Sequence, residues 1–261
     1  MNTKIKRMSL GLLIAIGTMS FIYVQDHKPT LYLIGDSTVK NGQDKGDRDE
    51  WGWGNLIAVH MDTSKIRIQN RALGGTSTRT YRSKGLWDEV LKDLKRDDVV
   101  IIQFGHNDGG PLDDTARARG TMKGIGNEQQ EIHNPLTNRQ ETVRTYGWYL
   151  KKYIEEAKAK GAQVIICSPV PRNNFSAGKT IRQEDSYTQW AEQVAKQEKV
   201  PFINLQERVA NEYDKLGEEE VAKFFPNDHT HTNRAGAQLN AKVFIQELRK
   251  MKKNALNKFI K

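Results

Sequence analysis

The stretch "TLYLIGDSTVK", residues 30–40, decides the fold of this chain. Its first six residues are mostly apolar, as expected of a strand in a parallel sheet that is covered on both faces. The apolar run ends abruptly at Gly35-Asp36-Ser37. Such an ending is typical of a turn with a helix cap, which needs no chemistry. It is less often the sign of a nucleophile held at the carboxyl edge of a sheet.

The composition is that of a soluble globular protein. The 261 residues, 37% hydrophobic and 28% charged, can form one well-packed domain or two small ones. The formal net charge of +9 suits a nucleic acid, an anionic lipid or an acidic polymer as partner, although it more often only aids solubility. Cys167 is the sole cysteine, which excludes an internal disulfide and a zinc site of the Cys₄ or Cys₂His₂ type.

The N-terminus predicts export. A basic head containing Lys4, Lys6 and Arg7 precedes residues 8–24, which carry no charge. This uncharged length lies between that of a signal-peptide core and that of a membrane-spanning helix. We therefore expect residues 1–29 to be a signal peptide or an N-terminal membrane anchor. The rest of the chain would be secreted or periplasmic, either free or anchored by residues 8–24.

Strands and helices alternate after residue 29. Five apolar segments predict strands, at residues 30–35, 65–70, 98–105, 162–168 and 200–205. Amphipathic segments between and after them predict helices, at residues 55–60, 85–95, 146–160, 186–199 and 233–251. This alternation predicts a single α/β domain over residues 30–261, folded as a three-layer sandwich with right-handed crossovers. The polar segment 109–139 is too long for a simple connection, and we expect it to influence ligand choice.

Four short motifs flank the predicted strands and the last helix. Three follow adjacent strands and the fourth precedes the final helix: residues 35–38, 70–81, 105–108 and 225–236. Because the carboxyl ends of parallel strands lie along one edge of a sheet, the first three motifs are expected to lie close together. The fourth can fold back toward them.

The residue types in these motifs suit acyl transfer. A serine hydroxyl such as that of Ser37 needs a base to accept its proton, and histidine suits that role near neutral pH. Asp228 and His231 are three residues apart and can meet across one turn, whereas the side chains of Asp228 and His229 tend to diverge. We therefore expect a triad of Ser37, His231 and Asp228.

An oxyanion hole can be built from the same motifs. Its donors would be the backbone N–H groups of Ser37 and Gly75 and the side-chain amide of Asn107. Gly75 suits this position because close approach of substrate to the main chain leaves no room for a side chain. Each motif alone is weak and is more simply explained by an ordinary turn or loop, but four such motifs in chain order at strand ends together favour a catalytic site.

Two other functions are consistent with the sequence. A metal-dependent hydrolase could use a set of carboxylates and imidazoles: Asp36, His106, Asp228, His229 and His231. A non-catalytic carbohydrate-binding protein could use exposed tryptophans and arginines. A nucleic-acid partner is disfavoured by the expected export and by the lack of any recognised nucleic-acid-binding module.

The motifs together resemble the SGNH (GDSL-type) hydrolases over essentially everything after residue 29. Five segments are similar to the rhamnogalacturonan acetylesterases in particular: "GDSTV" (35–39), "GWG" (52–54), "FGHNDGGP" (104–111), "SPVPRNNF" (168–175) and "FPNDHTHTNRAGA" (225–237). The resemblance implies a flavodoxin-like sandwich of about five parallel strands. It also implies removal of O-acetyl groups from pectin through an acetyl-enzyme, without a cofactor or metal.

The same resemblance implies roles for the five residues chosen above. Ser37 would be the nucleophile, Gly75 and Asn107 oxyanion donors, and Asp228 with His231 the acid–base pair. Related esterases act on acetylated xylan, other polysaccharides and lipids, so the substrate is less specific than the mechanism.

The expected partner is an acetylated acidic polysaccharide or oligosaccharide. Four cations, Arg71, Arg79, Arg82 and Lys84, surround the second motif and could attract the carboxylates of such a polymer, although a solvated basic face explains them equally well. Tryptophans such as Trp53 could stack on sugar rings. We assign four residues to substrate binding: Arg79, Arg82, Arg172 and Trp53.

Overall fold

The fold was analysed in a computed structural model that describes residues 28–40, 46–182, 186–252 and 254–261. The uncharged segment 8–24, predicted to direct export, lies outside the described residues. Within the described ranges, no helix is both long and apolar enough to cross a membrane.

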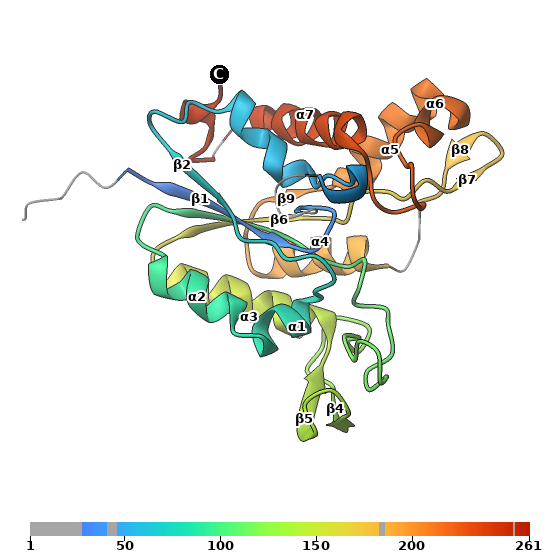
Figure 1. The fold of residues 1–261 in the computed structure, drawn as a ribbon. Coiled ribbons are helices and arrows are strands. Elements are labelled where there is room, and N and C mark those ends of the chain that lie inside the picture. Colours follow the sequence, from blue (N-terminus) through green and yellow to red (C-terminus); the bar gives the residue numbers. More distant parts are fainter. Residues whose placement is uncertain (1–27, 41–45, 183–185, 253) are drawn as a thin grey trace, which may run out of the picture.

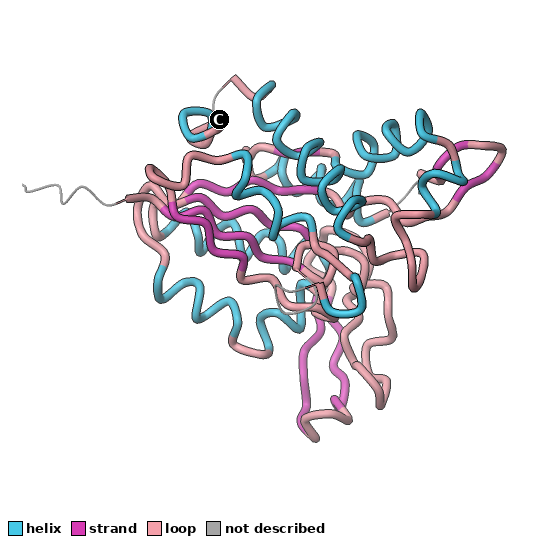
Figure 2. The backbone as a smooth tube through the Cα atoms, turned by 45° about the horizontal axis from the view of Figure 1, so that its top comes forward, coloured by secondary structure: helices cyan, strands magenta, loops and turns pink. Residues whose placement is uncertain are grey.

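A five-stranded parallel sheet forms the centre of the molecule (Figures 1 and 2). The strand order is β2-β1-β3-β6-β9, with all neighbours parallel. The bounds are β1 (Thr30–Gly35), β2 (Arg67–Asn70), β3 (Val99–Gln103), β6 (Gln163–Cys167) and β9 (Phe202–Ile203). All five predicted strands are therefore confirmed, β1 with the predicted bounds and the other four with shorter ends than the apolar runs suggested.

Helices cover both faces of the sheet, as predicted. One face carries η3 (Trp53–His60), α5 (Leu205–Leu216) and α7 (Arg234–Lys250), and the other carries α2 (Leu86–Asp93), α3 (Tyr146–Ala159) and α4 (Tyr187–Gln197) (Figure 1). Successive side chains of a strand point to opposite faces. Leu31 and Leu33 therefore pack against η3, α5 and α7 in what we call the first core, and Tyr32 and Ile34 pack against α2, α3 and α4 in the second core. This burial on both faces explains the continuous apolar run of β1.

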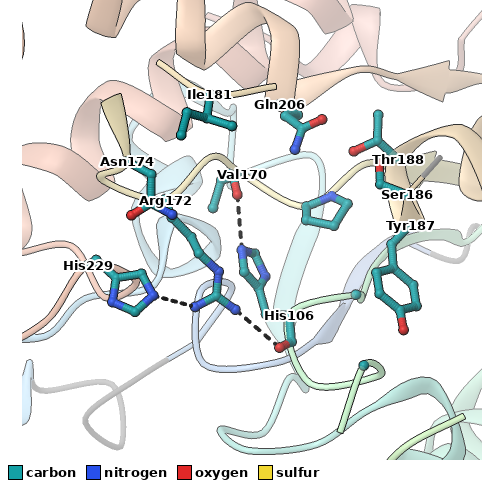
Figure 3. Close-up of a pocket in the computed structure, with 13 residues that line it drawn as sticks. His106, Val170, Arg172, Asn174, Ile181, Ser186, Tyr187, Thr188, Gln206 and His229 are labelled. Carbon is teal, nitrogen blue, oxygen red and sulfur yellow. Dashed lines mark hydrogen bonds between the residues drawn. The ribbon is translucent and has the colours of Figure 1, made fainter. Parts of the chain in front are cut away.

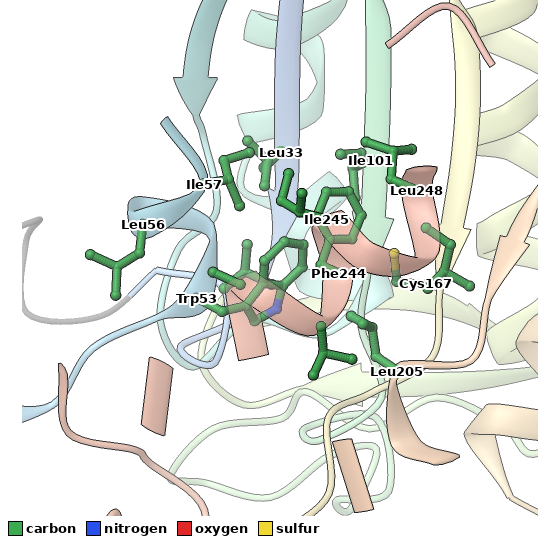
Figure 4. Packing of buried hydrophobic residues seen from close by; sticks show 14 of the residues in the cluster. Leu33, Trp53, Leu56, Ile57, Ile101, Cys167, Leu205, Phe244, Ile245 and Leu248 are labelled. Carbon is green, nitrogen blue, oxygen red and sulfur yellow. The ribbon is translucent and has the colours of Figure 1, made fainter. Parts of the chain in front are cut away.

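The first core is closed by an aromatic contact between η3 and α7. The rings of Trp53 and Phe244 lie 4.8 Å apart at 35°, and both side chains are fully buried (Figure 4). Cys167 lies in the same core, and burial raises the pKa of its thiol. The predicted helix at residues 55–60 is thus a 3₁₀ helix whose first residue anchors it in the core.

Several elements were not predicted. They are η2 (Asp47–Asp49), α1 (Thr78–Ser83), α6 (Glu218–Ala222), η4 (Asn257–Phe259), α5, and the hairpins β4 (Gln129–Asn134) with β5 (Arg139–Arg144) and β7 (Phe175–Ser176) with β8 (Lys179–Thr180). The first hairpin lies in and beyond the polar segment 109–139 and projects from the body (Figure 1). It buries little beyond Ile132, Asn134 and Val143, so its strands lack the apolar alternation by which strands are recognised.

Truncation of Phe244 tests the packing between η3 and α7. We expect Phe244→Ala to lower the free energy of unfolding by about 3–5 kcal/mol, because it leaves a cavity in a fully buried site. Leu216→Ala is the control, since Leu216 is 43% exposed and its loss should cost less than about 0.5 kcal/mol. Urea denaturation measures both, and equal losses for the two variants would contradict the packing described here.

Candidate active site

The candidate nucleophile lies in a turn that directly follows β1. The Asp36 carbonyl accepts hydrogen bonds from the N–H groups of Val39 (3.1 Å) and Lys40 (3.1 Å), which closes the turn around Ser37. The Asp36 carboxylate is completely buried and accepts bonds from the Thr38 N–H (2.9 Å) and hydroxyl (2.8 Å). Ser37 keeps 9% of its surface exposed, at the carboxyl edge of the sheet.

Three predicted residues from opposite ends of the chain meet at this turn. Ser37 Oγ lies 2.8 Å from His231 Nε2, and His231 Nδ1 lies 2.7 Å from Asp228 Oδ2. Asp228 Oδ1 also accepts the backbone N–H groups of Thr230 (2.6 Å) and His231 (2.8 Å). Partial burial opposes the charge of Asp228, but these bonds from His231 and Thr230 outweigh it and lower its pKa to about 2. The carboxylate is therefore ionised over the whole neutral range, beside the imidazole that it orients.

The two other predicted oxyanion donors line the same pocket, which has a volume of about 590 Å³. Gly75 is exposed and has φ of +78°, a conformation that L side chains rarely adopt. One N–H of the Asn107 amide donates to the Thr76 carbonyl (2.8 Å), which leaves the second N–H for a ligand. Arg119, which the sequence analysis did not single out, donates to the Gly75 carbonyl (3.0 Å) and holds this loop.

A buried chain of hydrogen bonds connects the nucleophile turn to the core. Trp53 Nε1 donates to Gln103 Oε1 (2.7 Å), and Gln103 Nε2 donates to the Thr38 hydroxyl (2.7 Å), which in turn bonds Asp36. On its other side, Asp36 Oδ2 lies 3.3 Å from His106 Nδ1. Burial opposes the charge of Asp36, yet the nearby His106 and the hydrogen bonds from His106 and Thr38 together lower its pKa.

The residues proposed for a metal site do not converge. Asp36 bonds His106, whose Nε2 lies 3.0 Å from the Val170 carbonyl, and His229 Nε2 lies 3.1 Å from Arg172 Nη1. Over the ranges that the structure describes, the acidic and histidine side chains close enough to share an ion are Glu50, Asp228 and His231. Two of these three are already bonded within the triad, so this grouping adds no evidence for a metal.

Two of the predicted substrate-binding residues are buried, which corrects the prediction. Trp53 is fully buried in the first core, where its ring packs on Phe244. Arg79 is 1% exposed, and its guanidinium makes two bonds to Glu141 (2.7 and 2.6 Å) and two to the carbonyls of Leu112 (2.8 Å) and Gly120 (3.0 Å). Arg79 therefore ties α1 to the 109–120 segment and to β5, and it cannot reach a ligand.

The other two predicted substrate-binding residues have different surroundings. Arg82 makes a bidentate pair with Glu156 (2.7 and 2.9 Å) and lines a separate depression over α1 and β5, so the prediction for it is also wrong for this pocket. Arg172 lines the pocket of Ser37, as a substrate-binding residue should, and its role stays a prediction. Residue type and proximity to a motif could not distinguish Arg172, which lines the pocket, from Arg79 and Arg82, because helix α1 directs the latter two away from it.

Asp108, next to Asn107, is a buried carboxyl group with an incomplete set of partners. Its Oδ1 accepts the N–H (3.0 Å) and the hydroxyl of Thr78, but its buried Oδ2 has no hydrogen-bond partner within the described residues. Burial raises the pKa of Asp108 to about 7, against the bonds from Thr78, and the charge of Asp36 adds to the rise.

Comparisons with known proteins agree with the motifs. A model of the GDSL-like Lipase/Acylhydrolase family matches residues 33–239. A rhamnogalacturonan acetylesterase of Emericella nidulans is 34% identical over 83% of this chain and 83% of its own. A probable rhamnogalacturonan acetylesterase of Bacillus subtilis is 30% identical over 85% of this chain and 93% of its own.

Solved structures share the fold. A Bacillus subtilis protein, YxiM, superposes with a TM-score of 0.69 at 26% identity, over 85% of this chain but only 56% of that longer one. An acetylxylan esterase of Geobacillus stearothermophilus has a TM-score of 0.57 at 19% identity over 84% of this chain and 94% of its own, which shows a shared fold alone. The predicted resemblance and fold class are confirmed.

The raised pKa of Asp108 predicts that the free energy of unfolding decreases as the pH rises. Between its ordinary pKa of 3.8 and about 7, the folded protein keeps a proton that the unfolded chain releases, so neutral pH disfavours folding. Asp108→Asn removes this titration and keeps an oxygen for Thr78. We expect the unfolding free energy of the variant, measured relative to that of the wild type, to increase by on the order of 3 kcal/mol as the pH rises from about 4.5 to 7.5.

Urea denaturation across this pH range measures the effect. Asp113→Asn, at an exposed position in the neighbouring segment, is the matched control and should follow the wild-type pH profile. Parallel profiles for wild type and Asp108→Asn would mean that the buried carboxyl group does not hold its proton in the folded state.

Proposed function

The chain belongs to the GDSL-like lipase/acylhydrolase family, and we propose that it is an exported serine esterase that removes O-acetyl groups from rhamnogalacturonan. It is a carboxylic ester hydrolase, as its family membership and its acetylesterase relatives indicate. The observation that carries the mechanism is the relay from Ser37 Oγ to His231 (2.8 Å) and on to Asp228 (2.7 Å), at the wall of a pocket that Asn107 also lines.

Acylation follows from this geometry. As Ser37 Oγ attacks the acetyl carbonyl carbon, His231 Nε2 accepts the hydroxyl proton, and the Asp228 carboxylate stabilises the resulting imidazolium. The oxyanion of the tetrahedral intermediate would accept bonds from the N–H groups of Ser37 and Gly75 and from the free N–H of Asn107. His231 then returns the proton to the sugar oxygen as its bond to the acyl carbon breaks, which leaves an acetyl group on Ser37.

Deacylation repeats these steps with water. His231 accepts a proton from a water molecule that attacks the acetyl-enzyme, and the same donors stabilise the second tetrahedral intermediate. The proton then moves to Ser37 Oγ as acetate leaves, which restores the starting enzyme. The complete cycle consumes one water molecule for each acetyl group released as acetate.

Unpaired cations around Ser37 support an acidic substrate. Lys84, Arg117, Arg119 and Arg172 line the pocket, and none of them forms an ion pair within 4.0 Å among the described residues. Among the described residues that line this pocket, Glu50 is the only acidic one. Regularly spaced carboxylates, as in a galacturonate-containing backbone, would complement this charge. The names of the two rhamnogalacturonan acetylesterases at 30–34% identity support the same substrate.

Export is proposed from the sequence of the N-terminus. The basic head and the uncharged segment 8–24 are the features that support it. A pectic polymer is too large to enter a cell, so an enzyme that acts on it directly would have to meet it outside the cytoplasm.

Two substitutions test the mechanism. Ser37→Ala should retain the fold and lose turnover of a chromogenic acetyl ester, because no nucleophile remains. Asn107→Ala should lower kcat by about 10²–10³, the range for loss of one oxyanion donor. Acetate release measures both, with circular dichroism as the control for folding. Residual turnover in Ser37→Ala, or a near-normal rate in Asn107→Ala, would remove that residue from the mechanism.

Substrate charge is tested by ionic strength. For acetylated rhamnogalacturonan, kcat/KM should fall as sodium chloride rises from about 0.02 to about 0.5 M, because salt screens the pocket cations, while a neutral chromogenic ester should respond much less. Lys84→Gln should weaken the salt response, and Lys92→Gln, at an exposed site outside the pocket, should not. Faster hydrolysis of acetylated xylan than of rhamnogalacturonan at low salt would overturn the acidic substrate.

A further inference from the structure

A second pocket of about 410 Å³, drawn in Figure 3, shares lining residues with the pocket of Ser37. His106 and Arg172 line both pockets and so form the partition between them. We propose that this second pocket, here called the Tyr187 pocket, binds a hexuronate residue of the polysaccharide chain that carries the acetyl group at Ser37. The proposal rests on the proposed function and adds to it a binding site for a sugar that does not react.

Side chains with unused hydrogen-bonding capacity line the Tyr187 pocket. The side-chain amides of Asn174 and Gln206 make no hydrogen bond with any described residue, and each offers two donors and an acceptor. The Thr188 hydroxyl, also in the lining, is buried and has no partner within the described ranges. The cost of an unsatisfied polar group applies to the buried Thr188 hydroxyl, whereas the two amides are half-buried. A sugar offers hydroxyls that can both donate to and accept from all three groups.

A fixed aromatic ring forms one wall of the pocket. The Tyr187 ring makes edge contacts with Tyr146 and with Trp190, both at 5.0 Å between centroids. Gly105, also in the lining, lies so close to this residue that a Cβ there would be 2.9 Å from the Tyr187 Cβ and 2.6 Å from Pro169 Cγ. A ring held in this way offers apolar surface to the C–H groups of a sugar without losing side-chain entropy on binding.

Charge selects an acidic sugar over a neutral one. Arg172 uses three of its five N–H groups, in bonds to Thr230 Oγ1, to His229 Nε2 (3.1 Å) and to the His106 carbonyl (3.3 Å), as Figure 3 shows for the latter two. These bonds fix the guanidinium at the partition and leave two N–H groups, including that at Nε, for a carboxylate. Asp36 and Asp228 are the acidic groups near Arg172, but neither forms an ion pair with it, and no acidic side chain is among the described residues that line the Tyr187 pocket. A carboxylate entering this pocket would therefore meet the guanidinium without an acidic lining residue to repel it.

Binding to an inactive variant tests the pocket apart from catalysis. In a Ser37→Ala background, trigalacturonate binding is measured by calorimetry. We expect Gln206→Ala to weaken binding about tenfold, the effect of losing one or two hydrogen bonds to the ligand. Gln189→Ala removes the same group from an exposed position on α4 outside the pocket and should bind as the Ser37→Ala parent does. Equal affinity of the Gln206 and Gln189 variants, or no binding of trigalacturonate, would overturn the proposal.

Kinetics separate this inference from the proposed function. With Ser37 intact, Gln206→Ala should raise KM for acetylated rhamnogalacturonan oligosaccharides about tenfold and leave kcat within about twofold, because the pocket holds a sugar that does not react. If the wild type releases acetate from the oligosaccharides but Gln206→Ala has an unchanged KM, the pocket is wrong and the esterase function stands. If the wild type releases no acetate although trigalacturonate binding depends on Gln206, the substrate is wrong and the pocket stands.

Discussion

The buried carboxylate of Asp36 is the constraint on which the site depends. A charge removed from water must be matched by hydrogen bonds or by an opposite charge, and this one is held by Thr38 through both its N–H and its hydroxyl and by His106. Each partner is itself anchored, Thr38 through Gln103 to Trp53 in the core, and His106 to the Val170 carbonyl. The turn that presents Ser37 is therefore fixed from both sides, and its geometry is set by the core rather than by the loop alone.

The strand order explains why these groups meet. β1 lies between β2 and β3, so the segments that follow these three strands all leave from one edge of the sheet. The loop after β2 supplies Gly75, and the loop after β3 supplies Asn107, whose amide bonds the Thr76 carbonyl of the neighbouring loop. Arg79 joins the same loops to the 109–120 segment and to the projecting hairpin, so this buried arginine positions the rim of the pocket without touching its contents.

The sequence predicted the features that depend on local residue pattern, and it failed for the features that depend on the direction in which a side chain points. Strands buried on both faces appear as continuous apolar runs, and Asp228 with His231 are spaced to meet across one turn, so the sheet and the geometry of the triad were accessible. The roles of Trp53, Arg79 and Arg82 were not, because an aromatic or cationic residue near a motif can face the core, a buried carboxylate or the solvent. The hairpin β4–β5 was missed because each of its strands carries a single buried apolar residue, Ile132 or Val143, which is too few for an alternating pattern. The four-residue spacing of Leu205, Val209 and Tyr213 could have revealed α5.

The Tyr187 pocket could not have been found from the sequence for a related reason. Its walls come mainly from the segments after β3 and β6 and the first turns of α4 and α5. The sequence assigned Arg172 to substrate binding, but no pattern in these segments predicts that they enclose a second pocket. What marks the pocket is two side-chain amides without protein partners and a buried, unpaired hydroxyl beside a fixed ring, a property of three-dimensional packing alone.

The placement of Cys167 has a practical consequence for work on this protein. The sole thiol of the chain is completely enclosed and is held in its protonated, unreactive form. A cysteine introduced at an exposed position such as Leu136, at the tip of the projecting hairpin, would therefore be the single site open to maleimide chemistry. Fluorophores or spin labels could be attached there without first removing a native residue, so that the approach of a polymer to the rim can be followed in solution.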